Sequence, residues 1–237
     1  MLLHGWAGSW RHWVRNVAAL SRTHRLLVPD LPGMGDSDPM TAGATRGAVA
    51  EAILQGLRHA LPPDARYAMV GFSFGGAVAG LAAAADGTRA ARVTLVAPGS
   101  FGPASIPPPT VRVRGLPGAE RAEAHRRNLR SLMFADPGRI DALALEVQER
   151  NTARMRATPV PRDAGVLQEA VRDMATTPHF IWGARDNFCG ERLDQHLGLV
   201  RTLRPSGAPV RVIEAAGHWV AYEAADAFDA ALLGSLA

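Results

Sequence analysis

A serine between glycines is the first feature of this sequence that could do chemistry. The segment Gly71-Phe72-Ser73-Phe74-Gly75 follows an apolar run typical of a strand and precedes a run of small residues typical of a helix. Serine nucleophiles of hydrolytic enzymes lie on such strand-to-helix turns, where flanking glycines relieve crowding. A serine that only caps the helix fits the same pattern, so the segment alone leaves both interpretations open.

Two further residues supply the general base and the orienting carboxylate that a serine nucleophile needs. His218 follows a glycine between the last predicted strand and the last predicted helix, and Asp186 comes just after another predicted strand. The chain order Ser73, Asp186, His218 is the order that the serine turn motif predicts. This agreement of residue type, position and order favours a nucleophile. Asp30 and Asp36, in an early loop, are the rival carboxylates.

The sequence also offers backbone donors for a developing negative charge. Phe74, directly after the serine, carries one of the unpaired N–H groups at the start of the predicted helix. Trp6, in the turn HGWAGS after the first apolar run, supplies the second N–H of a predicted oxyanion hole. His4 is interpreted as a support for this turn, because His218 is the better base for Ser73.

A parallel sheet is needed to bring these residues together. Apolar runs alternate with helical segments, which is typical of an α/β fold with a mostly parallel sheet and helices on both faces. Strands are predicted at 1–5, 24–30, 66–71, 91–98, 178–183 and 209–217. Sites assemble at the edge where such strands end. Because the first strand begins at Met1, we expect N-terminal strands of the sheet to be missing from this sequence.

The alternation stops at residues 99–175. A stretch rich in proline and glycine is followed there by three helical segments, at 119–134, 139–156 and 164–174. We interpret 99–175 as a helical insertion between two strands, and assign the core to 1–98 and 176–237.

Composition restricts the classes of function. The chain has 237 residues, 47% of them apolar, which is enough for one domain with a large core. No apolar run approaches the ~20 residues of a membrane-spanning helix, and the first residues do not resemble a signal peptide. With Cys189 as the only cysteine, an internal disulfide framework is excluded. We therefore expect a cytoplasmic protein that does not bind membranes.

The charged residues exclude further chemistry. All 26 basic residues are arginine, so Schiff-base chemistry through a lysine, including pyridoxal phosphate attachment, is excluded. A net charge of only +4 and 6% aromatic residues argue against nucleic-acid binding. No His, Asp and Glu set has the spacing of metal ligands. We expect neither a metal nor another cofactor.

Five segments resemble the α/β-hydrolase family, over nearly the whole chain. They are LLHGWAGSW, PDLPGMGDSD, VGFSFGGAVA, IWGARDNF and GHWVAYEAADAF. The resemblance implies that Ser73 is the nucleophile, His218 the general base and Asp186 the acid of a catalytic triad. It also implies that residues 99–175 form the cap domain, or lid, which shapes the substrate pocket of this family.

The triad predicts acyl transfer to water and leaves the substrate open. We expect a hydrolase for a carboxylic ester of a small or medium apolar substrate. The alternative is a carbon–carbon bond hydrolase of 2-hydroxy-6-oxo-dienoate ring-fission products, a group that GHWVAYEAADAF and NTARMRATPV resemble. In that case Arg154 or Arg156 would hold the substrate carboxylate. Phe188 and Trp219, close to the predicted catalytic residues, are the expected apolar lining.

Two interpretations from other classes stay open. A non-catalytic ligand-binding protein on the same fold is one, although such a protein has no evident use for a complete proton relay. The arginine-rich segment 120–130 could also dock an acidic acyl carrier protein, and a solvated helix face explains it equally well. The oligomeric state is not indicated by the sequence.

Overall fold

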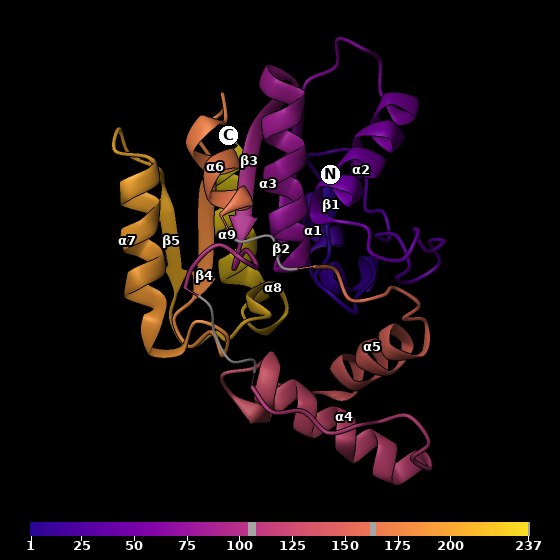
Figure 1. Ribbon diagram of the computed structural model, residues 1–237. Helices are drawn as coiled ribbons and strands as arrows, with labels where there is room; N and C mark the ends of the chain where they lie inside the picture. Colours follow the sequence, from indigo (N-terminus) through magenta and orange to yellow (C-terminus); the bar gives the residue numbers. More distant parts are fainter. Residues whose placement is uncertain (104–107, 162–164, 237) are drawn as a thin grey trace.

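The core of the computed structural model is a parallel sheet (Figure 1). The structure describes residues 1–103, 108–161 and 165–236. Within them the sheet has five strands in the order β1-β2-β3-β4-β5, every neighbouring pair parallel. The strands are β1 (Leu2–Leu3), β2 (Tyr67–Phe72), β3 (Ala90–Val96), β4 (His179–Gly183) and β5 (Val210–Ile213). The predicted α/β class is confirmed.

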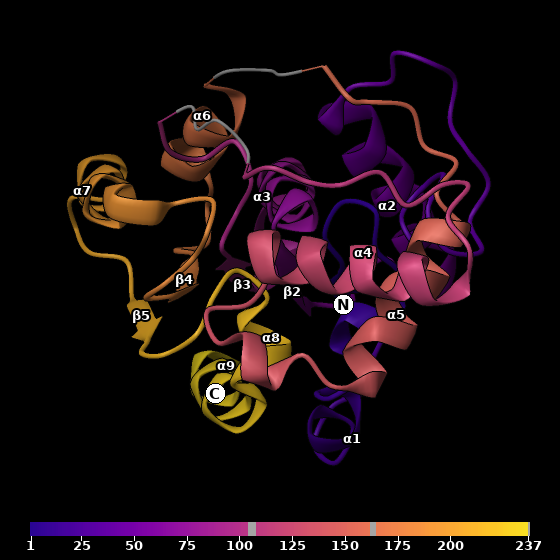
Figure 2. The ribbon, with the colours of Figure 1, turned by 90° about the horizontal axis from the view of Figure 1, so that it is seen from below.

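Helices cover both faces of this sheet, and Figure 2 shows the two layers from below. One layer contains α2 (Arg46–Ala60), α3 (Phe74–Asp86) and α6 (Val166–Asp173), with α7 (Leu193–Leu203) beside α6. The other contains α1 (Val17–Leu20), α8 (Val220–Glu223) and α9 (Ala225–Leu236). Because both faces are covered, strand residues such as Met69 and Val93 are fully buried. No helix in the described ranges has the length and apolar character of a bilayer span.

The helices between β3 and β4 divide into two groups. Helices α4 (Gly118–Leu132) and α5 (Ala142–Ala153) pack on each other below the sheet in Figure 1. Arg121 Nε lies 3.1 Å from the Glu149 carboxylate and links the two. Helix α6 instead packs on α3, where a Cβ added to Gly80 would lie 2.4 Å from Leu167. The insertion boundaries 99–175 remain a prediction, but α6 lies in the core layer.

The segment 24–30, predicted as a strand, does not form one. It runs beside β1, where Leu2 N–H donates to the Leu27 carbonyl at 2.8 Å. The pairing stops there because Pro29 has no N–H and Leu31 N–H donates to His4 Nε2 at 2.8 Å instead. The apolar run therefore supports the turn after β1 rather than extending the sheet.

Candidate active site

Ser73 is held in a strained turn between β2 and α3. Its φ of 52° and ψ of −115° are unusual for a residue with a side chain and cost about 1–3 kcal/mol. Ser73 N–H donates to the Val96 carbonyl at 2.9 Å, and the Ser73 carbonyl accepts from Gly99 N–H at 2.8 Å. Two bonds to β3 and the loop after it therefore fix the backbone that presents this side chain.

The glycines around Ser73 are required by close backbone contacts. A Cβ at Gly71 would lie 2.1 Å from the Gly75 carbonyl oxygen, and one at Gly75 would lie 2.3 Å from the His4 carbonyl oxygen. Both distances are far below van der Waals contact. The missing side chain at Gly75 lets the serine turn approach the end of β1, and the missing side chain at Gly71 lets the start of α3 pack against β2.

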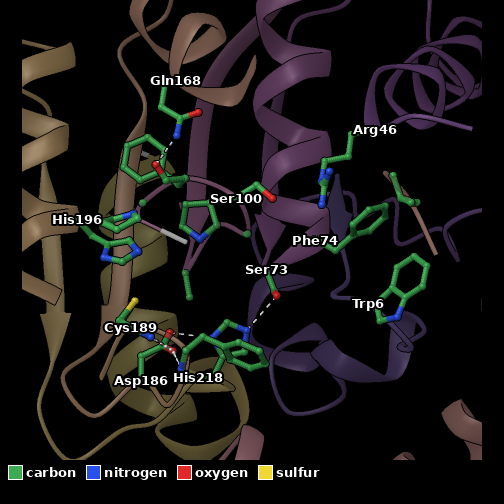
Figure 3. Close-up of a pocket in the computed structure, with 18 of the residues that line it drawn as sticks. Trp6, Arg46, Ser73, Phe74, Ser100, Gln168, Asp186, Cys189, His196 and His218 are labelled. Atoms are coloured by element: carbon green, nitrogen blue, oxygen red, sulfur yellow. Dashed lines mark hydrogen bonds and ion pairs between the residues drawn. The ribbon is translucent and has the colours of Figure 1, made fainter. Parts of the chain in front are cut away.

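Ser73, His218 and Asp186 form one chain of hydrogen bonds (Figure 3). His218 Nε2 lies 2.9 Å from Ser73 Oγ, and His218 Nδ1 lies 2.7 Å from Asp186 Oδ2. A carboxylate only accepts, so Nδ1 carries the proton and the Nε2 lone pair faces the serine hydroxyl. The structure thus brings the serine together with two residues from the last quarter of the chain.

Asp186 is buried and held ionised by its neighbours. Burial alone would raise the pKa of its carboxyl, but the electrostatic interaction and hydrogen bond with His218, together with two backbone hydrogen bonds, outweigh this effect. Oδ1 also accepts from Phe188 N–H at 2.8 Å and Cys189 N–H at 3.3 Å. The net result is a pKa below the usual value for aspartate, so this carboxylate is charged at neutral pH.

Two aromatic rings hold the imidazole of His218 in place. The Phe188 ring centroid lies 4.4 Å from that of His218, and the Phe72 ring centroid lies 4.9 Å from it. Phe188 also lines the cavity in front of the serine.

The predicted oxyanion donors lie beside Ser73. Trp6 and Phe74 both line the same cavity, with their rings edge to face at 5.1 Å. Their backbone N–H groups donate to no other residue that the structure describes. His4 supports this turn as expected, because its Nδ1–H donates to the Gly5 carbonyl at 2.8 Å. Burial lowers the pKa of His4 to about 4, so the ring is neutral.

The rival carboxylates have other tasks. Asp30 accepts from Trp10 N–H at 2.7 Å and from Asp36 N–H at 2.9 Å, so it closes the loop that contains both aspartates. Asp36 itself is exposed and paired with Arg154. Neither contacts His218.

A cavity of about 510 Å³ opens in front of Ser73. In Figure 3 the serine lies between Trp6, Phe74 and Arg46 on one side and Cys189, His196 and Gln168 on the other. The serine hydroxyl therefore faces a single cavity whose wall combines aromatic and polar side chains.

Three sequence-based assignments to the substrate pocket are corrected by the structure. Trp219 is fully buried behind His218, where its indole N–H donates to the His12 carbonyl at 2.8 Å. Arg154 pairs with Asp36, and Arg156 donates to the Ser37 carbonyl at 2.7 Å. These contacts hold the chain after α5 on the early loop. None of the three side chains lines the cavity.

Other lining residues were not anticipated. His196 is only 7% exposed, and its Nδ1–H donates to the Arg192 carbonyl at 2.9 Å. Arg46 donates to the Pro161 carbonyl at 2.8 Å and lies over the Phe74 ring. Both residues sit on helices without a motif around them, so no sequence signal marks them.

The arrangement can activate a hydroxyl. A neutral imidazole that accepts from a serine, and is itself oriented by a buried carboxylate, draws off the hydroxyl proton as the oxygen attacks. The N–H groups of Trp6 and Phe74, which have no acceptor among the described residues, could stabilise an oxyanion.

Comparison with known proteins agrees with this fold. The chain belongs to the alpha/beta hydrolase family, whose model matches residues 1–231. It is thus a hydrolase of that family.

The similar proteins carry names of more than one specificity. A 2-hydroxy-6-oxo-6-phenylhexa-2,4-dienoate hydrolase from Burkholderia cepacia is 28% identical over 253 residues, covering 100% of this chain and 87% of the relative. A meta-cleavage product hydrolase structure from Pseudomonas fluorescens IP01 matches with a TM-score of 0.74 at 22% identity, covering 99% of this chain and 89% of that one. A carboxylesterase from Bacillus subtilis matches with a TM-score of 0.76 at 17% identity, covering 99% and 82%.

Proposed function

We propose that the protein is a serine hydrolase that acts through an acyl-enzyme on carboxylic esters. The observation that carries this proposal is the continuous hydrogen-bonded chain from Asp186 through His218 to Ser73, which ends in an open cavity. A serine that only capped α3 would need neither a buried histidine nor a carboxylate aimed at it. Ser73 makes no side-chain capping bond to that helix.

The reaction proceeds in two halves. Ser73 Oγ attacks the ester carbonyl while His218 Nε2 takes its proton, and that proton leaves with the departing alcohol. Water then gives a proton to His218 and attacks the acyl-enzyme, after which Ser73 regains its proton and the acid departs. Trp6 and Phe74 N–H groups stabilise the oxyanion in both halves.

The cavity supports a small or medium apolar substrate. Its volume of about 510 Å³ lies within the range of small-molecule sites. Phe74, Phe101 and Phe188 contribute apolar surface to its wall. An ester with a short acyl chain fits these properties.

A second candidate is hydrolysis of a carbon–carbon bond in a 2-hydroxy-6-oxo-dienoate. It is favoured by the relative from Burkholderia cepacia, which is named for such a substrate and aligns with the whole chain. A dienoate also carries a carboxylate, and the guanidinium of Arg46 in the cavity wall can meet it, unlike those of Arg154 and Arg156. Water would add across the bond next to the 6-oxo carbon, giving an acid and a shorter hydroxydienoate.

Turnover of two substrates tests these candidates. Hydrolysis of p-nitrophenyl butyrate and of 2-hydroxy-6-oxo-6-phenylhexa-2,4-dienoate is measured for the protein and for Ser73→Ala. We expect ester turnover that Ser73→Ala abolishes, together with labelling of Ser73 by a fluorophosphonate. A much higher kcat/KM for the dienoate would instead select the second candidate. Absence of both turnover and labelling would contradict catalysis and favour the ligand-binding protein.

A further inference from the structure

A buried carboxylate lies between the histidine loop and the helical insertion. Glu223, at the end of α8 and five residues after His218, is only 2% exposed. Its Oε2 accepts from Gly217 N–H at 2.7 Å and Ala135 N–H at 3.0 Å, and its Oε1 accepts from Asp136 N–H at 2.8 Å. Three backbone donors therefore converge on one side chain.

These donors come from two parts of the chain. Gly217 directly precedes His218, whereas Ala135 and Asp136 follow α4 in the insertion. The carboxylate thus ties the loop that carries the proposed base to the end of the helix that lies below the sheet in Figure 1. Neither part reaches the other through a regular helix or strand bond.

Two further contacts press these parts together. Trp219 N–H donates to the Met133 carbonyl at 2.9 Å, on the other side of His218 from Gly217. A Cβ at Gly217 would lie 2.6 Å from the Ala135 nitrogen and 2.8 Å from the Met133 oxygen. His218 is therefore flanked on both sides by residues whose backbones rest on the segment after α4.

We propose that Glu223 is a positioning residue that makes the placement of His218 over Ser73 depend on the docking of the α4–α5 pair. This inference rests on the proposed function, because it takes His218 to be the base. Glu223 acts through the backbone of Gly217 and touches no reacting atom. Movement of the insertion would be transmitted to the histidine through the three bonds to this one carboxylate.

The chemistry of the site requires a carboxylate. Oε1 serves one donor and Oε2 serves two, so both atoms must accept. A glutamine has one acceptor and one NH₂ group, which would face a backbone N–H whichever way the amide turned. Glu223→Gln keeps the volume of the side chain but must lose at least one of the three bonds and turn an NH₂ group toward a backbone N–H.

Glu223→Gln is compared with Thr94→Val as a matched control. Thr94 Oγ1 and Ser235 Oγ are 2.9 Å apart in the core between β3 and α9, so the control loses a buried hydrogen bond away from the histidine loop. Both variants are studied well below their melting temperatures. Three properties are measured: kcat and KM with p-nitrophenyl butyrate, the far-downfield NMR signal of the His218 Nδ1 proton, and amide hydrogen exchange.

For Glu223→Gln we expect kcat to fall about 100-fold with little change in KM, as a displacement near 1 Å would cause. The downfield proton signal should broaden or disappear, and the amides of 133–136 and 217–219 should exchange faster together. Thr94→Val should keep kcat within twofold and retain the signal. If Glu223→Gln does not fold, Glu223→Asp, which is one methylene shorter, takes its place.

A retained downfield signal with kcat within twofold would overturn the inference, and so would faster exchange in only one of the two segments. Signal and exchange need no turnover. These two measurements therefore test whether Glu223 links the histidine loop to the insertion, even if the protein hydrolyses neither substrate and the proposed function fails.

Discussion

Replacement of Asp186 by asparagine tests the proposed relay through the proton position on His218. In the structure, Oδ1 of Asp186 accepts from two backbone N–H groups and Oδ2 accepts from His218 Nδ1. In the Asp186→Asn variant, the amide oxygen would stay with the two N–H groups, so the NH₂ group would face the imidazole. His218 would then carry its proton on Nε2, pointing at Ser73, and could not take the serine proton.

The size of the effect follows from these bonds. Turning the amide over would leave two buried N–H groups facing an NH₂ group, which costs roughly 1–3 kcal/mol for each. A total of about 4 kcal/mol corresponds to a roughly thousandfold loss of rate. The variant also loses the negative charge that stabilises the imidazolium. We therefore expect kcat to fall by about 10⁴-fold with the fold retained.

The assay is steady-state hydrolysis of p-nitrophenyl butyrate, with circular dichroism to confirm folding. Asp36→Asn is the matched control, because Asp36 is an exposed aspartate whose partner is Arg154. It should retain kcat within twofold. If folded Asp186→Asn keeps more than a tenth of the original kcat, the tautomer argument is refuted.

Three further predictions concern stability. Gly75→Ala should lower the free energy of unfolding by about 1–3 kcal/mol and reduce activity, because its Cβ would meet a backbone oxygen at 2.3 Å. Gly56→Ala, with open space around its Cβ, should raise the free energy of unfolding. Urea unfolding measures both changes. Burial raises the pKa of Asp229 to about 6, so stability falls as pH rises from ~4 to ~6. Asp229→Asn removes the charge while its amide oxygen can still accept from Asn16 Nδ2, which donates to Asp229 Oδ1 at 2.8 Å, so it should raise Tm at pH 8 more than at pH 4.5. Burial lowers the pKa of His4 to about 4, below its usual value near 6.5. The stabilisation that the neutral His4 ring contributes is therefore complete above pH ~6.5 and is lost as the pH falls to ~4. A His4→Gln variant whose Tm depends on pH as the parent's does would contradict this.

The position of the candidate triad could be predicted from the order of strands and polar residues along the chain. Ser73, Asp186 and His218 each come shortly after an apolar strand, and parallel strands end at one edge of a sheet. Their proximity could therefore be predicted without coordinates. The parallel sheet with helices on both faces followed from the same alternation.

Side-chain direction and distant pairing could not be predicted. Trp219 is the neighbour of His218, yet its ring points into the core. Arg154 finds its partner in Asp36, more than a hundred residues away, and spacing along a helix says nothing of such a pair. His196 lines the cavity from a helix whose sequence carries no motif. The direction of each of these side chains depends on how distant parts of the chain pack together in the folded protein.

The rings that flank His218 determine which end of the cavity receives each part of an ester substrate in the proposed mechanism. Because Phe72 and Phe188 hold the imidazole, it cannot turn over without displacing both. In the proposed mechanism, the Nε2 that takes the Ser73 proton also delivers it to the departing alcohol. The alcohol must therefore leave on the histidine side, and the acyl chain occupies the opposite end. Isomeric esters whose acid and alcohol portions are exchanged are then unequal substrates, although their size and polarity are the same.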